Sequence, residues 1–109
     1  MRTLKFIVDG QTIKQDPNCD FSGLVPGTEG YLKAVFTFSS EWADSVRIAT
    51  FHSVMGKEYP PQILHNGTQC MIPPEALKRK TFKVGVVGKK GETKMTTNKV
   101  AVSQNGGSK

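Results

Sequence analysis

Side chains suited to covalent chemistry are few in this 109-residue chain, and they are widely spaced. Ser39 and Ser40 precede Glu41, but a serine nucleophile also needs a general base. The two histidines, His52 and His65, would have to reach those serines through folding. We expect His52, which follows a strand, to be half buried and His65, which precedes an Asn-Gly turn, to be exposed. The sequence therefore predicts a protein that is not an enzyme. The catalytic alternative is a small hydrolase whose activity depends on His52 or His65.

Carboxylates, phosphate loops and metal-ligand patterns give no stronger signal. Glu41 and Asp44 could form the carboxylate pair of a glycosidase, but nothing in their loop would raise the pKa of either. Residues 89–91 (KKG) follow a strand without the helix N-terminus that a phosphate loop requires. The GxSxG, HExxH, P-loop and GxGxxG motifs are absent from the sequence. We expect no catalytic residue, no bound metal and no cofactor.

The two cysteines favour a structural role. Cys19 and Cys70 could pair only with each other, and two cysteines do not make a disulfide framework. Cys70 precedes Met71 and Ile72, so we expect a buried, unreactive thiol at this position. Both cysteines are expected to remain thiols in a protein made inside a cell.

Positive charge is concentrated at the C-terminal end of the chain. Residues 1–77 carry six basic and eight acidic side chains, whereas residues 78–109 carry nine basic side chains and one acid, Glu92. A basic surface attracts nucleic acids, nucleotides or acidic protein faces. The candidate basic interaction face consists of Lys78, Arg79, Lys80, Lys89, Lys90, Lys94 and Lys99.

That basic face has a structural alternative and a limited range of partners. Lysines also keep exposed strands from pairing with strands of other chains, without binding any ligand. Proteins that bind single-stranded nucleic acid stack bases on exposed aromatic rings, and no aromatic residue follows Phe82. Nucleic acid is therefore a weaker candidate than an acidic protein surface.

Alternating apolar residues and turn signals predict strands along most of the chain. Residues 2–8 and 11–14 should form a hairpin around Asp9-Gly10, followed by an irregular loop at 15–30. The further strands are expected at residues 31–38, 46–51, 62–64, 69–72, 81–87 and 94–102, with residues 62–64 and 69–72 forming a second hairpin. Pro60 and Pro61 indicate a sheet edge or a bulge.

These elements predict an all-β fold: an antiparallel, immunoglobulin-like β-sandwich with an N-terminal hairpin and one short helical turn at residues 73–78. Residues 1–103 should form a single domain and residues 104–109 a flexible tail. The structural core is expected from Phe36, Phe38, Trp42, Phe51, Phe82, Val84 and Val86, with Trp42 closing one end. No run approaches the roughly 18 apolar residues of a membrane span, so no membrane partner is expected.

Five segments carry a resemblance to a known family. They are residues 36–42 (FTFSSEW), 49–51 (ATF), 70–77 (CMIPPEAL), 82–88 (FKVGVVG) and 96–100 (TTNKV). Together they resemble the immunoglobulin-like β-sandwich domain of tail and baseplate proteins from phages of Gram-positive bacteria, and in particular the N-terminal domain of baseplate upper proteins. The resemblance covers about residues 31–102.

The resemblance implies attachment and assembly rather than catalysis. It predicts a phage structural or accessory protein that is made in the host cytoplasm, resides in the virion and docks onto other virion proteins of the tail, baseplate or capsid surface. Such domains are usually followed by others, whereas this chain ends at Lys109 and begins with an extra hairpin, which favours a small adaptor.

Docking could use the basic face or strand addition at the hairpin of residues 4–14, and a homo-oligomer is possible. The alternative is a small cytoplasmic phage protein that sequesters a nucleotide, a nucleic acid or a host factor.

Overall fold

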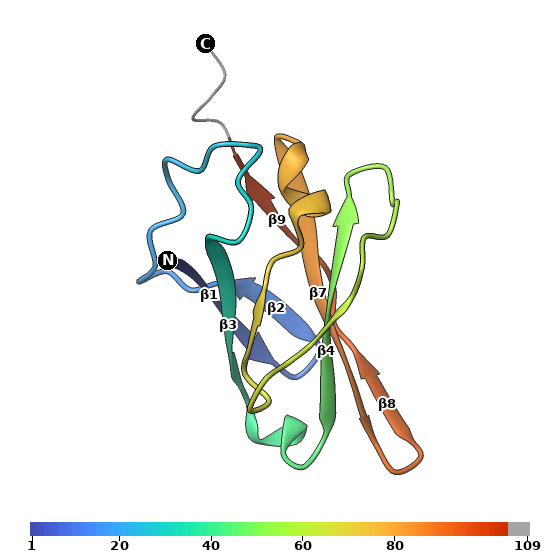
Figure 1. Cartoon of the computed structure of the whole chain (residues 1–109). Helices are drawn as coiled ribbons and strands as arrows, with labels where there is room; N and C mark the ends of the chain where they lie inside the picture. Colours follow the sequence, from blue (N-terminus) through green and yellow to red (C-terminus); the bar gives the residue numbers. More distant parts are fainter. Residues whose placement is uncertain (105–109) are drawn as a thin grey trace.

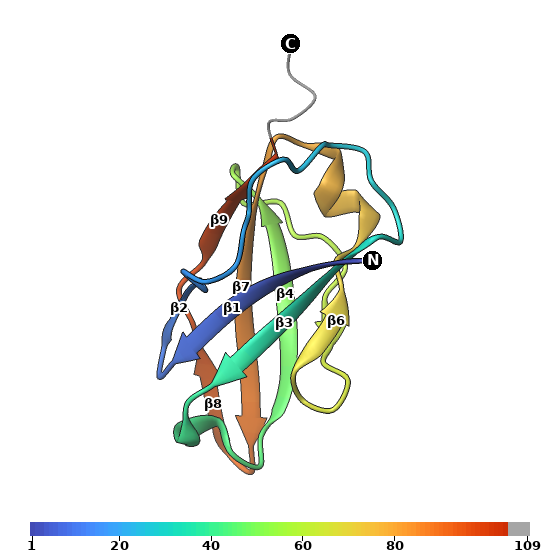
Figure 2. The ribbon, with the colours of Figure 1, turned by 90° about the vertical axis from the view of Figure 1, so that its left-hand side faces the viewer.

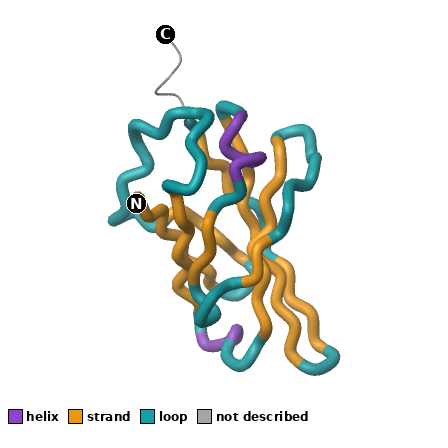
Figure 3. The backbone as a smooth tube through the Cα atoms, in the orientation of Figure 1, coloured by secondary structure: helices purple, strands orange, loops and turns teal. Residues whose placement is uncertain are grey.

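The computed structural model describes residues 1–104 and has two β-sheets that face each other, as expected for an all-β sandwich. Figure 1 shows the two layers, and Figure 3 shows how strands make up most of the backbone. The strands are β1 (Arg2–Asp9), β2 (Thr12–Gln15), β3 (Leu32–Phe38), β4 (Val46–Ser53), β5 (Gln62–Ile63), β6 (Gln69–Met71), β7 (Thr81–Lys90), β8 (Thr93–Thr96) and β9 (Val100–Ser103). The expected helical turn is the 3-10 helix η2 (Pro74–Lys78), and a second one, η1 (Ser40–Trp42), was not expected from the sequence.

One sheet has the order β2-β1-β3-β6, and its central pair is parallel rather than antiparallel. Parallel neighbours need a long connection that returns the chain to the same end of the sheet. Strand β2 and the loop of residues 16–31 provide this connection, and Figure 2 shows β1 and β3 running in the same direction. The Arg2 side chain fixes the loop by donating to the carbonyl oxygens of Asp20 (2.9 Å) and Ser22 (2.6 Å).

The other sheet has the order β5-β4-β7-β8, with β9 also paired to β7. The sequence predicted one strand at residues 94–102, and the structure divides it into β8 and β9. Thr97 remains bonded to β7, because its N–H donates to the Val86 carbonyl and its hydroxyl accepts from the Val86 N–H, both at 3.0 Å. The next residue, Asn98, turns toward β2 of the opposite sheet and so interrupts the strand.

Of the expected hairpin of residues 62–64 and 69–72, the structure has the turn, which one antiparallel bridge between His65 and Gln69 closes, but its two strands belong to different sheets. Strand β5 pairs with β4, whereas β6 pairs with β3. Between them, Asn66 and Gly67 have positive φ angles of 52° and 71°, and this turn lets the chain cross from one sheet to the other. The two prolines that precede β5 lie at a sheet edge, as predicted.

The core lies between the sheets and contains six of the seven predicted residues as fully buried side chains: Phe36, Trp42, Phe51, Phe82, Val84 and Val86. Phe38 is half buried instead, and the Arg47 guanidinium covers its ring at 4.3 Å. Trp42 closes the end of the sandwich where η1 lies, and its indole N–H donates to the Gly10 carbonyl at 2.8 Å.

The predicted flexible tail is wrong at its first residue. Gln104 is fully buried, and its Nε2 donates to the carbonyl oxygens of Leu77 (3.1 Å) and Arg79 (2.8 Å). These bonds tie the residue after β9 to the end of η2 and to the residue that follows it. The other predicted tail residues, 105–109, lie outside the described residues. Within residues 1–104, no helix combines the length and the apolar character needed to cross a membrane.

Candidate docking surface

The outward-facing positions of the β5-β4-β7-β8/β9 sheet, here called the outer face, carry an exposed apolar row. Alternation along β4 directs Ala49 and Phe51 into the core and Val46 and Ile48 away from it. In the register of the sheet, Ile48 lies between Ile63 of β5 and Val87 of β7. Val46 and Ile63 are 64% and 69% exposed. We call Val46, Ile48, Ile63 and Val87 the apolar row.

A shallow depression of about 620 Å³ lies over this part of the outer face. It is lined by Val46, Ile48, Val87, Gly88, Lys89, Gly91 and Lys94. The apolar side chains form its centre, and the two lysines are cross-strand partners at its side. Large exposed apolar side chains that meet on one sheet face are typical of interaction surfaces in small proteins.

Positive charge lies along the β7 and β8 side of the apolar row. Lys83 and Lys89 share the outward direction of Val87 along β7, and Lys94 faces the same way from β8. Lys99 lies on the outer face near the end of β4 and the start of β7, where it lines a hollow together with His52 and Lys83. One carboxylate, that of Glu58, lines this hollow as well, and Glu58 forms a β-bridge with His52, whereas the outward positions of the described strands themselves carry no carboxylate.

Gly85 leaves room for the Thr50 hydroxyl on the outer face, next to Lys99. A Cβ atom at this position would be 3.1 Å from the Thr50 hydroxyl and 3.5 Å from Cγ of Lys99. The distance to Thr50 is tighter than ordinary van der Waals contact, whereas the distance to Lys99 is an ordinary contact, so a side chain here would crowd the Thr50 hydroxyl and lie against the lysine. The small residue that the sequence places in a core strand thus has a role on the outside of the sheet.

The seven predicted basic residues are not brought together on one surface. Lys89, Lys94 and Lys99 belong to the outer face, whereas Lys90 lines a different hollow with Glu41 and Trp42. The other three, Lys78, Arg79 and Lys80, lie before β7 begins. A strand rises about 3.3 Å per residue, so the two ends of the ten-residue β7 are roughly 30 Å apart.

The N-terminal hairpin offers less to a partner strand than the sequence indicated. The outer edge of β2 is already bonded to the segment between β8 and β9. Gln11 and Gln15 donate through their side-chain amides to the carbonyl oxygens of Thr96 (3.1 Å) and Ala101 (3.0 Å). The Asn98 N–H donates to the Gln11 carbonyl at 3.1 Å. Strand addition at this edge would have to break these bonds.

The groups considered for catalysis are separated. Ser39 lies beside η1, and its hydroxyl accepts from the Gly10 N–H at 3.0 Å, whereas His52 lies near the other end of β4 (Figure 1). His52 is buried, not half buried, and burial and the charge of Lys99 lower its pKa, with Glu58 opposing them. His65 is exposed, as predicted. Among residues 1–104, the Ser39 hydroxyl bonds to the Gly10 N–H and to Glu41, and no hydrogen bond joins either serine to a histidine.

The cysteines and the acidic groups do not form a metal centre. Cys70 is buried, as expected, and burial raises the pKa of its thiol to about 12. Cys19 is half buried on the loop that follows β2, and both residues are free thiols. Among residues 1–104, no three His, Cys, Asp or Glu side chains come close enough together to hold a metal ion.

No protein-family model, no curated protein and no solved structure matches this chain.

Proposed function

We propose that this chain is a non-catalytic component of a phage particle that docks through its outer face onto other virion proteins. The observation that carries the proposal is the apolar row, in which Val46 and Ile63 remain mostly exposed within a lysine-bearing sheet face. The resemblance of residues 31–102 to baseplate sandwich domains supports a place in the tail, the baseplate or the capsid surface. The protein would be made in the host cytoplasm and become part of the virion.

The composition of the outer face favours a protein partner over a nucleic acid. Its centre is aliphatic, and no aromatic side chain occupies an outward position in the described strands of this sheet. Binding of single-stranded nucleic acid relies on aromatic stacking beside the positive charges. An aliphatic centre with a charged rim is instead the usual arrangement of a protein interface.

Charge complementarity specifies the partner further. Lys89 and Lys94 flank the apolar row, so the matching surface has an apolar centre and an acidic rim. Two copies of this chain docked face to face would bring like charges together, which opposes a homodimer through this surface. The occupant of the outer face is therefore a different virion protein.

Mass spectrometry of purified phage particles tests this function. The proposal predicts that the chain is present in a fixed copy number that matches a ring or a lattice of the particle. Absence from particles despite clear expression in infected cells would contradict it. That result would favour the alternative of a cytoplasmic protein that sequesters a nucleotide, a nucleic acid or a host factor.

A further inference from the structure

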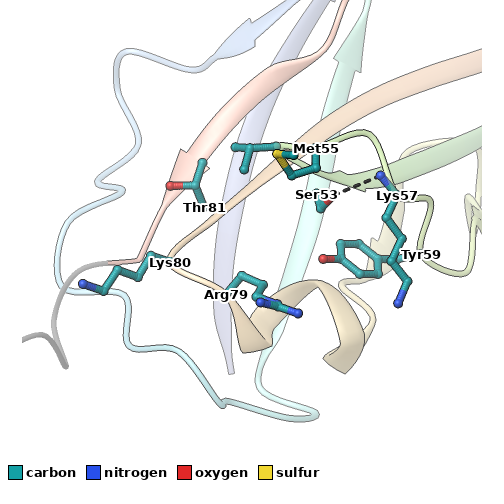
Figure 4. Close-up of a pocket in the computed structure, with 8 residues that line it drawn as sticks. Ser53, Met55, Lys57, Tyr59, Arg79, Lys80 and Thr81 are labelled. Atoms are coloured by element: carbon teal, nitrogen blue, oxygen red, sulfur yellow. Dashed lines mark hydrogen bonds between the residues drawn. The ribbon is translucent and has the colours of Figure 1, made fainter.

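A further hollow lies beside the first residues of β7, at the end of this strand that is remote from the β7–β8 turn. Its volume is about 410 Å³, and it is lined by Ser53, Val54, Met55, Lys57, Tyr59, Arg79, Lys80 and Thr81. These residues come from the end of β4, the following turn, the residue after η2 and the start of β7 (Figure 4). The lining contains three cations and no carboxylate, so the hollow is suited to an anionic group.

Tyr59 places an unused polar group in this hollow. Its side chain is only 9% exposed, and its backbone N–H donates to the Phe51 carbonyl at 2.8 Å, which fixes the residue against β4. No hydrogen bond joins the Tyr59 hydroxyl to another residue in the described part of the chain, and this oxygen is not fully buried but accessible from the hollow. A tyrosine hydroxyl that is accessible in this way can donate a hydrogen bond to a ligand. Figure 4 shows the hydroxyl directed toward the space beside Arg79.

Arg79 provides the charge opposite Tyr59. Its guanidinium points toward the tyrosine in Figure 4, whereas the ammonium of Lys80 points away from the other residues drawn. The Arg79 backbone is held by Gln104, whose Nε2 donates to the Arg79 carbonyl at 2.8 Å. On the other wall, the Lys57 N–H donates to the Ser53 hydroxyl at 3.0 Å and fixes the turn. Both walls of the hollow are therefore anchored through their backbone.

We propose that this hollow binds a carboxylate that is attached to an apolar group, as at the C-terminus of a peptide with an aliphatic last residue. A guanidinium matches the two oxygens of a carboxylate, and the Tyr59 hydroxyl adds one more donor. Lys80 points away, and the Lys57 ammonium lies on the other side of the Tyr59 ring from its hydroxyl (Figure 4), so Arg79 is the cation that faces the space beside this hydroxyl. A single facing cation suits a singly charged carboxylate better than a doubly charged phosphate. Val54 and Met55, which are 55% and 92% exposed, offer apolar contacts to the neighbouring group. This site shares no lining residue with the depression over the apolar row and does not depend on the proposed function.

Titrations followed by amide NMR shifts of the full chain test the site. The probes are N-acetyl-leucine, which has a free carboxylate, its uncharged amide, N-acetyl-glutamic acid α-amide, which carries a side-chain carboxylate, and inorganic phosphate. N-acetyl-leucine should shift Ser53, Lys57 and Thr81 with a Kd of about 1–10 mM, as expected for so small a ligand. Its amide should bind about tenfold more weakly, because it lacks the charge that Arg79 recognises.

Three variants separate the roles of the lining residues. Arg79→Gln should weaken binding of N-acetyl-leucine about tenfold and Tyr59→Phe about threefold, while Lys80→Gln, the matched control, should leave the Kd nearly unchanged. The amide spectrum of each variant reports whether it remains folded. Equal binding of acid and amide, tighter binding of phosphate, or an unchanged Kd in Arg79→Gln would overturn the proposal. Tighter binding of the glutamic acid derivative would retain the carboxylate site and assign it to side chains instead of C-termini.

Discussion

Asn98 binds both backbone polar groups of Ile13, although the two residues are 85 positions apart and belong to opposite halves of the sandwich. Its Oδ1 accepts from the Ile13 N–H at 2.8 Å, and its Nδ2 donates to the Ile13 carbonyl at 3.4 Å. A side-chain amide offers a donor and an acceptor, as a neighbouring strand would. Asn98 thus takes the place of a neighbouring strand at the edge of β2. It occupies backbone groups that could otherwise pair with a strand of another chain.

Replacing Asn98 by alanine should lower the free energy of unfolding by about 1–3 kcal/mol, because both groups of Ile13 lose their partner. Urea denaturation measures the loss, and hydrogen exchange of the Ile13 amide should accelerate at the same time. Asn18→Ala, at an exposed position of the 16–31 loop, is the matched control and should change neither. An unchanged exchange rate of the Ile13 amide in Asn98→Ala would show that the two hydrogen bonds from Asn98 do not protect this edge.

Gly88 is predicted to be required by Trp42. A Cβ atom at residue 88 would lie 2.5 Å from Cζ3 and 2.8 Å from Cε3 of the indole. Gly88→Ala should therefore destabilise the protein by about 1–3 kcal/mol through overpacking. In the background of Trp42→Phe, which removes those ring atoms, the same substitution should cost clearly less in thermal or urea unfolding. Additive effects of the two substitutions would mean that Gly88 is needed for another reason.

Strand positions and the core followed from the sequence because alternation is a local signal. Phe82, Val84 and Val86 point inward as the period of two predicts, and Trp42 fills the end of the core. The parallel pairing of β1 with β3 could not be obtained this way, since it depends on how the 16–31 loop returns the chain. The break at Thr97 and Asn98 depends on a contact with β2, which no local pattern contains.

The candidate surface was only partly predictable for a similar reason. Counting charges along the chain grouped Lys89 with Lys90, yet adjacent residues of a strand point to opposite faces. Alternation alone would have separated these two and added Lys83, which lies on the same face as Lys89. The exposure of Ile63 and Val46 required the structure, because an apolar residue in a strand is more often part of the core.

Stability should fall at mildly acidic pH because of His52. Burial is the main cause that lowers the pKa of His52 from its ordinary value of 6.5, and Lys99 adds to it. The unfolded chain therefore takes up a proton at a higher pH than the folded chain. The free energy of unfolding then decreases as the pH falls below 6.5 toward the lowered pKa.

His52→Gln should reduce this pH dependence, measured by urea denaturation at about pH 7.5 and about pH 5.5. His65→Gln, which changes an exposed histidine, should retain the dependence of the original protein. If both variants lose the same amount of stability between the two pH values, His52 is not the group responsible.

The two thiols should differ in reactivity. Thiolates react with alkylating reagents, and burial raises the pKa of the Cys70 thiol to about 12. Iodoacetamide at about pH 8 should therefore modify only the half-buried Cys19 in the native protein and both cysteines in denaturant. Mass spectrometry counts the adducts, and native Cys19→Ser should acquire none. Rapid modification of Cys70 in that variant would mean that the core between β3 and β6 opens readily.

The outer face is tested by variants that change one surface at a time. Ile63→Asp places a charge in the apolar row, and Lys89→Glu with Lys94→Glu reverses the sign of the two charges beside it. Val25→Asp is the control for an exposed apolar residue elsewhere, and Lys5→Glu with Lys14→Glu produces the same change in net charge on the β2-β1-β3-β6 sheet. All six substituted residues are exposed, so each of the four variants should remain folded.

The most direct measurement is the binding of the purified chain, and of these variants, to phage particles assembled without it, by co-sedimentation at low and high salt. Docking through the outer face predicts saturable binding that Ile63→Asp weakens about tenfold or more. The Lys89 and Lys94 reversal should weaken it chiefly at low salt, where charge pairs are least screened. Both controls should bind like the original chain. Unchanged binding of Ile63→Asp, or no binding of the original chain to the particles, would contradict the account.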